Sequence, residues 1–241
     1  MAEPVDITER FGAAEGAAVA VCLCAFVLLG AAALALPEVP AVLAQAANDT
    51  KATTGLGNTV NGVLMNIRAF ETMMEKAVVL LALTGVFVLG PGGGWMGRPG
   101  NFPVLPPPEP ELSLLLRALV PLSVLTAVYL LWTGADHPGG AFQGGTVLAG
   151  VAVLLVISGT RPAPGHGTRG IRGLAAAGVG AFLLAGAACL PWTQGFLDYP
   201  PALAKAFVIV IEAGLLVSVG ALLFLLAGGA PVSDGLGERV P

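Results

Sequence analysis

The sequence predicts an all-α, polytopic membrane protein with about six transmembrane helices. The chain is 56% hydrophobic and only 11% charged, whereas about 25% of the residues in a soluble domain are charged. Apolar runs of about 20 residues, long enough to cross a bilayer, recur along it. The six runs cover residues 16–36, 70–90, 113–133, 141–159, 173–190 and 202–226.

A spacer rich in proline and glycine divides these runs into a two-helix front half and a four-helix back half. Seven prolines and five glycines occupy the twenty positions 91–110, where a helix cannot persist and a stiff spacer is expected. We therefore expect a membrane module at residues 1–90, a linker at 91–111 and a four-helix domain at 112–241. Residues 37–67 are too polar to span, and we expect a short interfacial helix near 39–47 followed by an extended or hairpin piece.

The charges beside the runs predict the orientation. The first run follows acidic residues, whereas a signal peptide begins with basic ones, so we expect this run to remain as a permanent helix. If all six runs span, the positive-inside rule places both termini in the cytoplasm. The predicted inner side carries Arg10, Arg98, Arg161, Arg169, Arg172 and Arg239, and the outer side carries Lys51, Arg68 and Lys205.

Composition also excludes some functions. The net charge of −4 leaves no basic stripe for nucleic acid. The three cysteines, at positions 22, 24 and 189, lie inside apolar runs with no C-x-x-C pair, which is typical of small buried side chains. We expect no cofactor and no metal site.

Glu212 lies in the middle of the last apolar run. It follows the start of that run by ten residues, about 15 Å into a core roughly 30 Å thick. A charge there costs about 2.5 to 3.5 kcal/mol, so Glu212 should face protein or water. It marks a candidate ion path, although a protonated Glu212 that bonds a neighbouring helix is the structural alternative.

The second run has charges at its start. Only residues 77–90 are free of charge, too few to span, so Glu71, Glu75 and Lys76 must lie below the membrane surface. Glu71 and Glu75 are one helical turn apart and should repel each other. Lys76 points elsewhere and is expected to reach the interface or pair with another subunit. A helix end anchored by interfacial charges is the alternative to an ion path.

Three further titratable residues precede helices. Asp198 comes before the last run, and Asp136 and His137 come before the fourth. Helix capping explains such residues, and a funnel that attracts cations is the functional alternative.

A glycine-rich octet begins the fourth run. Its residues Pro138, Gly139, Gly140, Phe142, Gly144 and Gly145 permit unusual turns and close helix approach. The octet lacks the lysine and the serine or threonine of a phosphate loop. We expect it to seat this helix against other subunits.

The back half resembles a known family. The string GADHPGGAFQGGTVLAG resembles the G-x-x-x-P-G-G-G-F-x-G-G signature of the B subunit of Mrp-type multisubunit cation/proton antiporters, which also occurs in membrane-bound hydrogenases. FLDYPP and the helix with Glu212 resemble the end of that subunit, so the likeness covers about residues 112–227. The third glycine of the octet is Ala141 here, and the family more often has aspartate near Glu212.

The front half is similar to the carboxy-terminal part of the antiporter A subunit, or to the E-type subunit of the hydrogenases. The pattern there is N-x-V-N-x-I-L-V-D-F-R-G-F-D-T-x-G-E. Asn66, Glu71 and Met74 depart from it, and the loss of an aspartate at position 66 removes one candidate ion ligand. The matching residues are Asn58, Asn61, Arg68, Phe70, Thr72 and Glu75.

These resemblances imply an accessory subunit of a multisubunit Na⁺/H⁺ antiporter, with Glu75 and Glu212 on a path for a proton or cation. Protons and cations would compete for the same carboxylate oxygens. The alternatives are the same module in a redox-driven complex, such as a hydrogenase or a complex I relative, and a scaffold without an ion path. In each case the partners are other membrane subunits and the lipid bilayer.

Overall fold

The computed structural model describes residues 13–35, 42–90, 97–102, 106, 108–165, 167–193 and 195–232. The chain separates into two compact units, residues 1–45 and residues 46–241. In the first unit, α1 (Ala13–Leu34) is an apolar helix of 22 residues whose large described side chains are exposed. The acidic residues and Arg10 that precede it lie outside the described residues.

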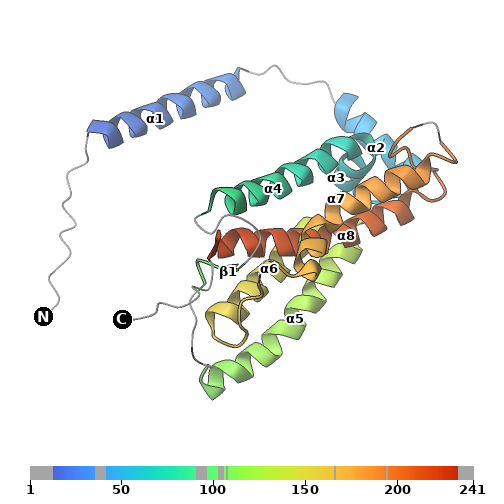
Figure 1. Cartoon of the computed structure of the whole chain (residues 1–241). Coiled ribbons are helices and arrows are strands. Elements are labelled where there is room, and N and C mark those ends of the chain that lie inside the picture. The colour runs from blue at the N-terminus through green and yellow to red at the C-terminus, as the bar shows by residue number, and fades with distance from the viewer. Residues whose placement is uncertain are drawn as a thin grey trace, which may run out of the picture. The chain divides into compact units, whose positions relative to one another are not determined.

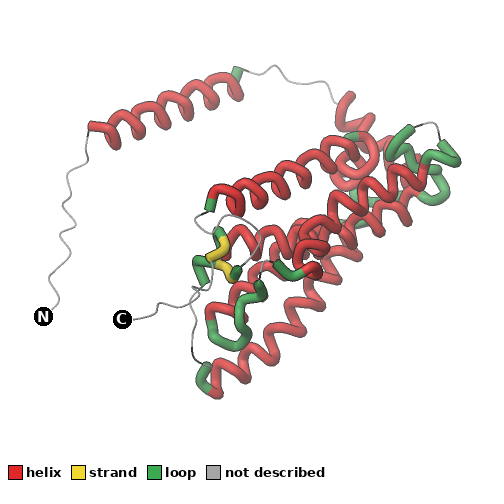
Figure 2. The backbone as a smooth tube through the Cα atoms, viewed as in Figure 1, coloured by secondary structure: helices red, strands yellow, loops and turns green. Residues whose placement is uncertain are grey.

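Six helices of the structure coincide with the six apolar runs. After α1 these are α4 (Ala69–Leu89), α5 (Pro110–Gly134), α6 (Ala141–Ile157), α7 (Arg169–Cys189) and α8 (Ala204–Gly228). Shorter elements complete the chain (Figures 1 and 2): α2 (Val42–Thr54), α3 (Thr59–Gly62), the π-helical segment η1 (Val63–Ile67), and the two-residue strands β1 (Arg98–Pro99) and β2 (Pro231–Val232). The predicted all-α membrane fold is thus confirmed.

Four of these helices, α4, α5, α7 and α8, are long and apolar enough to cross a membrane. The apolar helix α6 has 17 residues, and the described apolar part of α1 (Val19–Leu34) is also shorter. At 1.5 Å per residue, α6 reaches about 25 Å, less than the hydrocarbon core of about 30 Å.

The prediction for residues 37–67 was wrong in its second part. Residues 42–54 form α2, as the expected interfacial helix suggested, but no extended or hairpin piece follows within the described residues. Instead α3 and η1 lead directly to α4. Asn58 explains this start, because its side-chain oxygen accepts hydrogen bonds from the backbone N–H groups of Val60 and Asn61 and so caps α3.

Within the second unit, α8 is the central helix. It packs along α6 and α7, while α5 packs on α6 and α4 contacts both α7 and α8 (Figure 1). Of its most apolar window, 61% of the residues are buried, against 11 to 28% for the other three long helices. α8 is therefore the most enclosed of the long helices, and protein rather than lipid surrounds most of its side chains.

The two short strands join the predicted linker to the residues that follow α8. Arg98 pairs with Val232 and Pro99 with Pro231 in an antiparallel bridge. This contact holds the described part of the predicted linker against the end of α8. Residues 91–96, 103–105 and 107 lie outside the described residues, and the predicted domain division at 91–111 stays a prediction.

Candidate functional site

Glu212 lies on α8 about 12 Å along the helix axis from Ala204. Its residue surface is only 4% exposed, so protein surrounds it, as the cost of a charge in hydrocarbon requires. One carboxylate oxygen, Oε1, accepts a hydrogen bond of 3.2 Å from Nδ2 of Asn61. The other oxygen, Oε2, is buried without a hydrogen-bond partner among the described residues.

Asn58 and Asn61 connect the front half to the end of α5. Nδ2 of Asn61 also donates to the carbonyl oxygen of Gly134 at 3.0 Å. Nδ2 of Asn58 donates to the same oxygen at 2.9 Å and to the carbonyl oxygen of His137 at 3.0 Å. Helix ends leave carbonyl groups without intrahelical partners, and these two amides satisfy them at the last turn of α5. They also fix Asn61 beside Glu212.

The start of α6 faces the same carboxyl group. Gly139 and Gly140 have φ angles of +154° and +131°, a backbone that side chains rarely adopt. This turn places Gly140 so that a Cβ atom built on it would lie 3.3 Å from Oε1 of Glu212. The backbone N–H of Ala141, the first residue of α6, faces the same carboxyl group. The positive end of the helix dipole stabilises negative charge there.

A cavity of about 370 Å³ opens beside Glu212. Its wall combines residues from α3, η1 and α4 of the front half with residues from the octet and α8 of the back half. Glu75 and Lys76 are its charged members besides Glu212, and Thr72 and Gln143 add polar atoms. The cavity thus unites the acids that the sequence singled out in two distant segments.

Lys76 is held over an aromatic ring at the cavity wall. Its Nζ atom lies 4.5 Å from the ring centroid of Phe142 in the first turn of α6. An ammonium group in this position is attracted by the negative face of the ring. This contact lies within the chain, and the predicted reach of Lys76 to the interface or to another subunit stays a prediction.

Residues 112–230 match the sequence profile of a family described as "Domain related to MnhB subunit of Na+/H+ antiporter". They form an MnhB-related domain. This domain begins at α5 and ends just before β2, so it supplies the octet and Glu212. The front half lies outside it and supplies Asn58, Asn61, Glu75 and Lys76.

Two solved structures share this fold. One is described as "membrane-bound sulfane sulfur reductase (MBS), an archaeal respiratory membrane complex", with a TM-score of 0.68 and 21% identity over 88% of this chain and 95% of that chain. The other is the Mrp complex from Dietzia sp. DQ12-45-1b, with a TM-score of 0.63 and 21% identity over 95% of this chain and 27% of that chain. No curated protein sequence matches the chain. Both likenesses extend beyond the MnhB-related domain into the front half.

The octet packs inside the MnhB-related domain. A Cβ atom on Gly144 would lie 2.5 Å from Cδ1 of Leu216 and 2.7 Å from the carbonyl oxygen of Ala127, and one on Gly145 would lie 2.7 Å from Cβ of Val219. These glycines therefore let α6 approach α5 and α8 closely. The expectation that the octet seats this helix against other subunits was wrong for these positions, because the neighbours belong to the same chain.

Glu71, one of the predicted path residues, lies outside the cavity. Glu71 forms an ion pair with Arg68, three residues earlier and at the exposed start of α4, and it does not line the cavity. Phe70, also exposed, lies in the same turn. The pair reduces the repulsion that we expected between Glu71 and Glu75, and it anchors the helix end.

Asp136 and its neighbours form a second polar cluster outside the cavity. Both oxygens of Asp136 accept hydrogen bonds of 2.8 Å from Nζ of Lys205, and Oδ1 accepts a third from the backbone N–H of Gly57. The hydrogen bond from Lys205, before all other causes, holds the pKa of Asp136 below its usual value. Asp136 therefore closes an ion pair between α8 and the α5–α6 connection rather than capping α6.

Asp198 and His137 contribute no side chain to the cavity wall. Asp198 is exposed, and its backbone carbonyl, not its carboxylate, accepts a hydrogen bond from Thr193. The N-cap of α8 is Leu203, which makes no side-chain hydrogen bond to the helix. Asp198 therefore does not cap α8 as expected. His137 contributes its carbonyl oxygen to Asn58.

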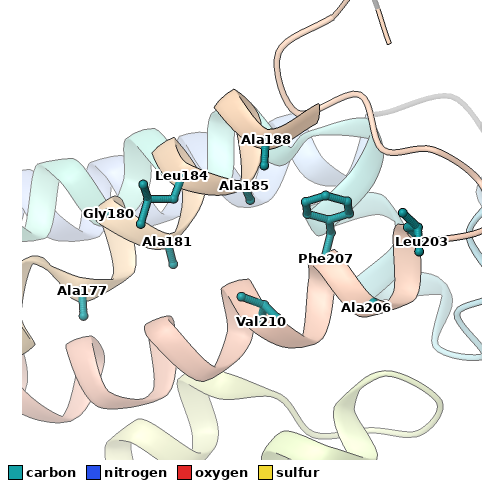
Figure 3. A pocket seen from close by; sticks show the side chains of 10 residues that line it. All are labelled: Ala177, Gly180, Ala181, Leu184, Ala185, Ala188, Leu203, Ala206, Phe207 and Val210. Carbon is teal, nitrogen blue, oxygen red and sulfur yellow. The ribbon is translucent and has the colours of Figure 1, made fainter. Parts of the chain in front are cut away.

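A larger, purely apolar groove runs between α7 and α8. It has a volume of about 610 Å³ and is lined by Ala177, Gly180, Ala181, Leu184, Ala185, Ala188, Leu203, Ala206, Phe207 and Val210 (Figure 3). None of these side chains is titratable, is charged or can bind a metal. Despite its size, the groove has no chemistry of its own, and the candidate site remains the cavity at Glu212.

Sequence reasoning missed two parts of the site. Gln143 lines the cavity, and the carbonyl of Gly134 receives both amides. Gln143 is the only polar side chain of the octet beyond its turn, which was the available signal. Among the described residues, no cluster of three His, Cys, Asp or Glu side chains is arranged for a metal.

Proposed function

We propose that this protein is an accessory integral membrane subunit of a multisubunit Na⁺/H⁺ antiporter, and that the cavity at Glu212 belongs to its path for protons or cations. The proposal places the chain in a bacterial cytoplasmic membrane with both termini in the cytoplasm. The orientation rests on the distribution of basic residues, of which Arg10 and Arg239 lie outside the described residues.

The single observation that supports this function most is the environment of Glu212. A carboxyl group deep in an apolar helix is 4% exposed, has one unpartnered oxygen and borders a cavity with Glu75 and Lys76. A structural acid would be expected to have both oxygens bonded. An acid that gains and loses a proton or a cation needs a free oxygen and polar surroundings, so the unpartnered Oε2 and the polar cavity wall support the proposal.

Other subunits are part of the proposal. Glu75 is exposed at the cavity, and in hydrocarbon an exposed acid requires a polar partner. Besides the charged residues of the cavity, the described residues contain no further pair of acidic and basic side chains inside an apolar helix that could continue a route across the membrane. We therefore infer that companion subunits cover Glu75 and supply the rest of the path.

A redox-driven complex is the second candidate, favoured by one observation. The likeness to a chain of an archaeal respiratory complex covers 95% of that chain, whereas the likeness to the Mrp complex covers 27% of its chain. In such a complex, electron transfer elsewhere would drive the movement of ions past Glu212. The third candidate is a scaffold in which Glu212 only stabilises the contact with Asn61.

Removing one titratable group separates transport from scaffolding. Glu212→Gln keeps the shape of the side chain and an oxygen that can accept from Asn61, but it removes the titratable proton. In the intact complex reconstituted in vesicles, we expect assembly to be preserved and sodium-driven proton movement, followed with an internal pH dye, to be lost. Glu75→Gln should reduce the rate as well.

Glu71→Gln is the matched control, because Glu71 is on the same helix as Glu75 but pairs with Arg68 outside the cavity. This variant should transport at close to the parental rate. Parental rates in all three variants would leave only the scaffold. If proton movement by the parental complex requires an electron donor rather than a sodium gradient, and the variants lose that movement, the redox-driven complex is favoured.

A further inference from the structure

The groups around the Glu212 carboxylate are hydrogen-bond donors. Oε1 receives the amide of Asn61 at 3.2 Å, and the backbone N–H of Ala141 faces the same carboxyl group. The positive end of the α6 dipole lies behind that N–H. Each of these groups attracts an anion and repels a cation.

The nearby carbonyl oxygens are already engaged. The carbonyl of Gly134 accepts two amide hydrogen bonds, from Asn58 and Asn61, and a carbonyl oxygen has two lone pairs. Oδ1 of Asn58 accepts from two backbone N–H groups. The hydroxyl of Thr72 is engaged with the carbonyl of Leu64. The side-chain oxygens left in the wall besides those of Glu212 therefore belong to Asn61, Gln143 and Glu75, and are fewer than the roughly six oxygen ligands that hard metal cations take.

A fixed cation already occupies the cavity wall. The Nζ atom of Lys76 lies over the Phe142 ring, and Lys76 and Glu212 line the same cavity. A tethered ammonium group cannot diffuse away, so it opposes the approach of any second cation. A proton differs, because it needs a single acceptor, and Oε2 of Glu212 is buried without a partner.

The remaining charge in the cavity wall is the carboxylate of Glu75, which is exposed, whereas Lys76 is half-buried. Glu75 and Lys76 come from α4; α3, η1 and α6 contribute no charged residue to the cavity wall. The arginines of α7, Arg169 and Arg172, lie at its opposite end. Cys189 and Tyr199 pack with the first turns of α8, and both are neutral near pH 7 by their ordinary pKa values.

We propose that the Glu212 cavity is a proton site that excludes sodium and other metal cations, and that Lys76 is the residue that sets this selectivity. The inference rests on the proposed function and narrows it: a proton passes through Oε2 of Glu212, and sodium moves elsewhere in the complex.

Carbodiimide modification tests the ligand of Glu212 directly. Dicyclohexylcarbodiimide reacts with protonated carboxyl groups in apolar surroundings, and mass spectrometry of the intact complex locates the product. Labelling of Glu212 should slow as the pH rises. At ten times its dissociation constant, a sodium ion on the carboxylate would slow labelling about elevenfold, by the factor of one plus concentration over Kd. We expect a change smaller than about twofold when sodium chloride replaces choline chloride, because no such complex forms.

Lys76→Met tests the source of the selectivity, and Lys51→Met is its control because Lys51 is exposed on α2 and does not line the cavity. Sodium protection of Glu212 should appear in Lys76→Met and stay absent in Lys51→Met. Sodium protection in the parental complex, or no labelling of Glu212 at any pH, would overturn the proton site. Lys76→Met without sodium protection would overturn the role of Lys76.

Failure of this inference and failure of the proposed function give different results. Transport by Glu212→Gln reports whether the acid is needed, whereas labelling reports which ion it binds. A complex in which Glu212→Gln transports normally but labelling ignores sodium would refute the transport role and retain the proton site.

Discussion

Replacing Gly144 with alanine should destabilise the helix bundle, and Gly150 on the same helix is the matched control. A Cβ atom on Gly144 would lie 2.5 Å from Cδ1 of Leu216 and 2.7 Å from the carbonyl oxygen of Ala127. Leu216 can change its rotamer, but the carbonyl is fixed in α5, so α5 and α6 must separate. A Cβ atom on Gly150 meets nothing within 4 Å.

The difference between the two variants isolates the clash. Each substitution gains the same helix propensity, about 0.8 to 1 kcal/mol, which cancels in the comparison. Overpacking of a tight contact costs about 1 to 3 kcal/mol. We therefore expect Gly144→Ala to have an unfolding free energy lower than that of Gly150→Ala by about 1 to 3 kcal/mol.

Reversible unfolding of the purified chain in mixed detergent micelles, by titration with dodecyl sulfate, measures this difference. The slope of the transition should be the same in both variants, because the same surface is exposed on unfolding. Equal unfolding free energies for the two variants would refute the close approach of α6 to α5.

Three further results follow from single contacts. Ser218→Ala removes a buried hydrogen bond of 2.7 Å to the carbonyl of Ala175, and the same titration should show a loss of about 1 kcal/mol; an unchanged midpoint would show that α7 and α8 do not depend on it. Asn61→Ala removes the amide that donates to buried Oε1 of Glu212, while Asn58 still donates to the carbonyl of Gly134, and it should cost about 1 to 3 kcal/mol, more than Ser218→Ala. The lowered pKa of Asp136 implies that its pairing with Lys205 stabilises the fold above the ordinary pKa of 3.8 and that this contribution is lost as the pH falls through the lowered value. Lys205→Met should therefore flatten the dependence of thermal stability on pH below about 4, and an unchanged pH profile would argue against the pair.

The six helices could be predicted because apolar length alone determines them. The burial of Glu212 was also predictable, since hydrocarbon does not tolerate an unshielded acid. Its partner was not, because Asn61 lies 151 residues away in the sequence and no periodicity links α3 to α8. The family pattern marked Asn61 but gave no reason for its presence.

Other contacts had a local signal that charge counting overlooked. Arg68 and Glu71 are three residues apart, a spacing that places side chains on one helix face. The start of α3 was likewise indicated by Asn58, a favoured N-cap residue. The pairing of Asp136 with Lys205 across 69 residues had no such signal, since it depends on how the two connections meet.

The packing partners of the octet glycines could not be predicted from the sequence either. Their number indicated close packing, but the identity of the neighbours depends on the crossing of α6 with α5 and α8. An octet at a subunit boundary and one inside a bundle have the same sequence pattern. The structure decides for the inside at Gly144 and Gly145.

The most direct test of the account asks whether water reaches the cavity beside Glu212. In the complex with Cys22, Cys24 and Cys189 replaced by serine, Gln143→Cys lines the cavity and Ala181→Cys lines the apolar groove. A small, membrane-impermeant thiosulfonate reacts with thiols that water reaches, so we predict modification of Gln143→Cys and none of Ala181→Cys. If Gln143→Cys is as unreactive as Ala181→Cys, the cavity is dry and Glu212 has no route for a proton.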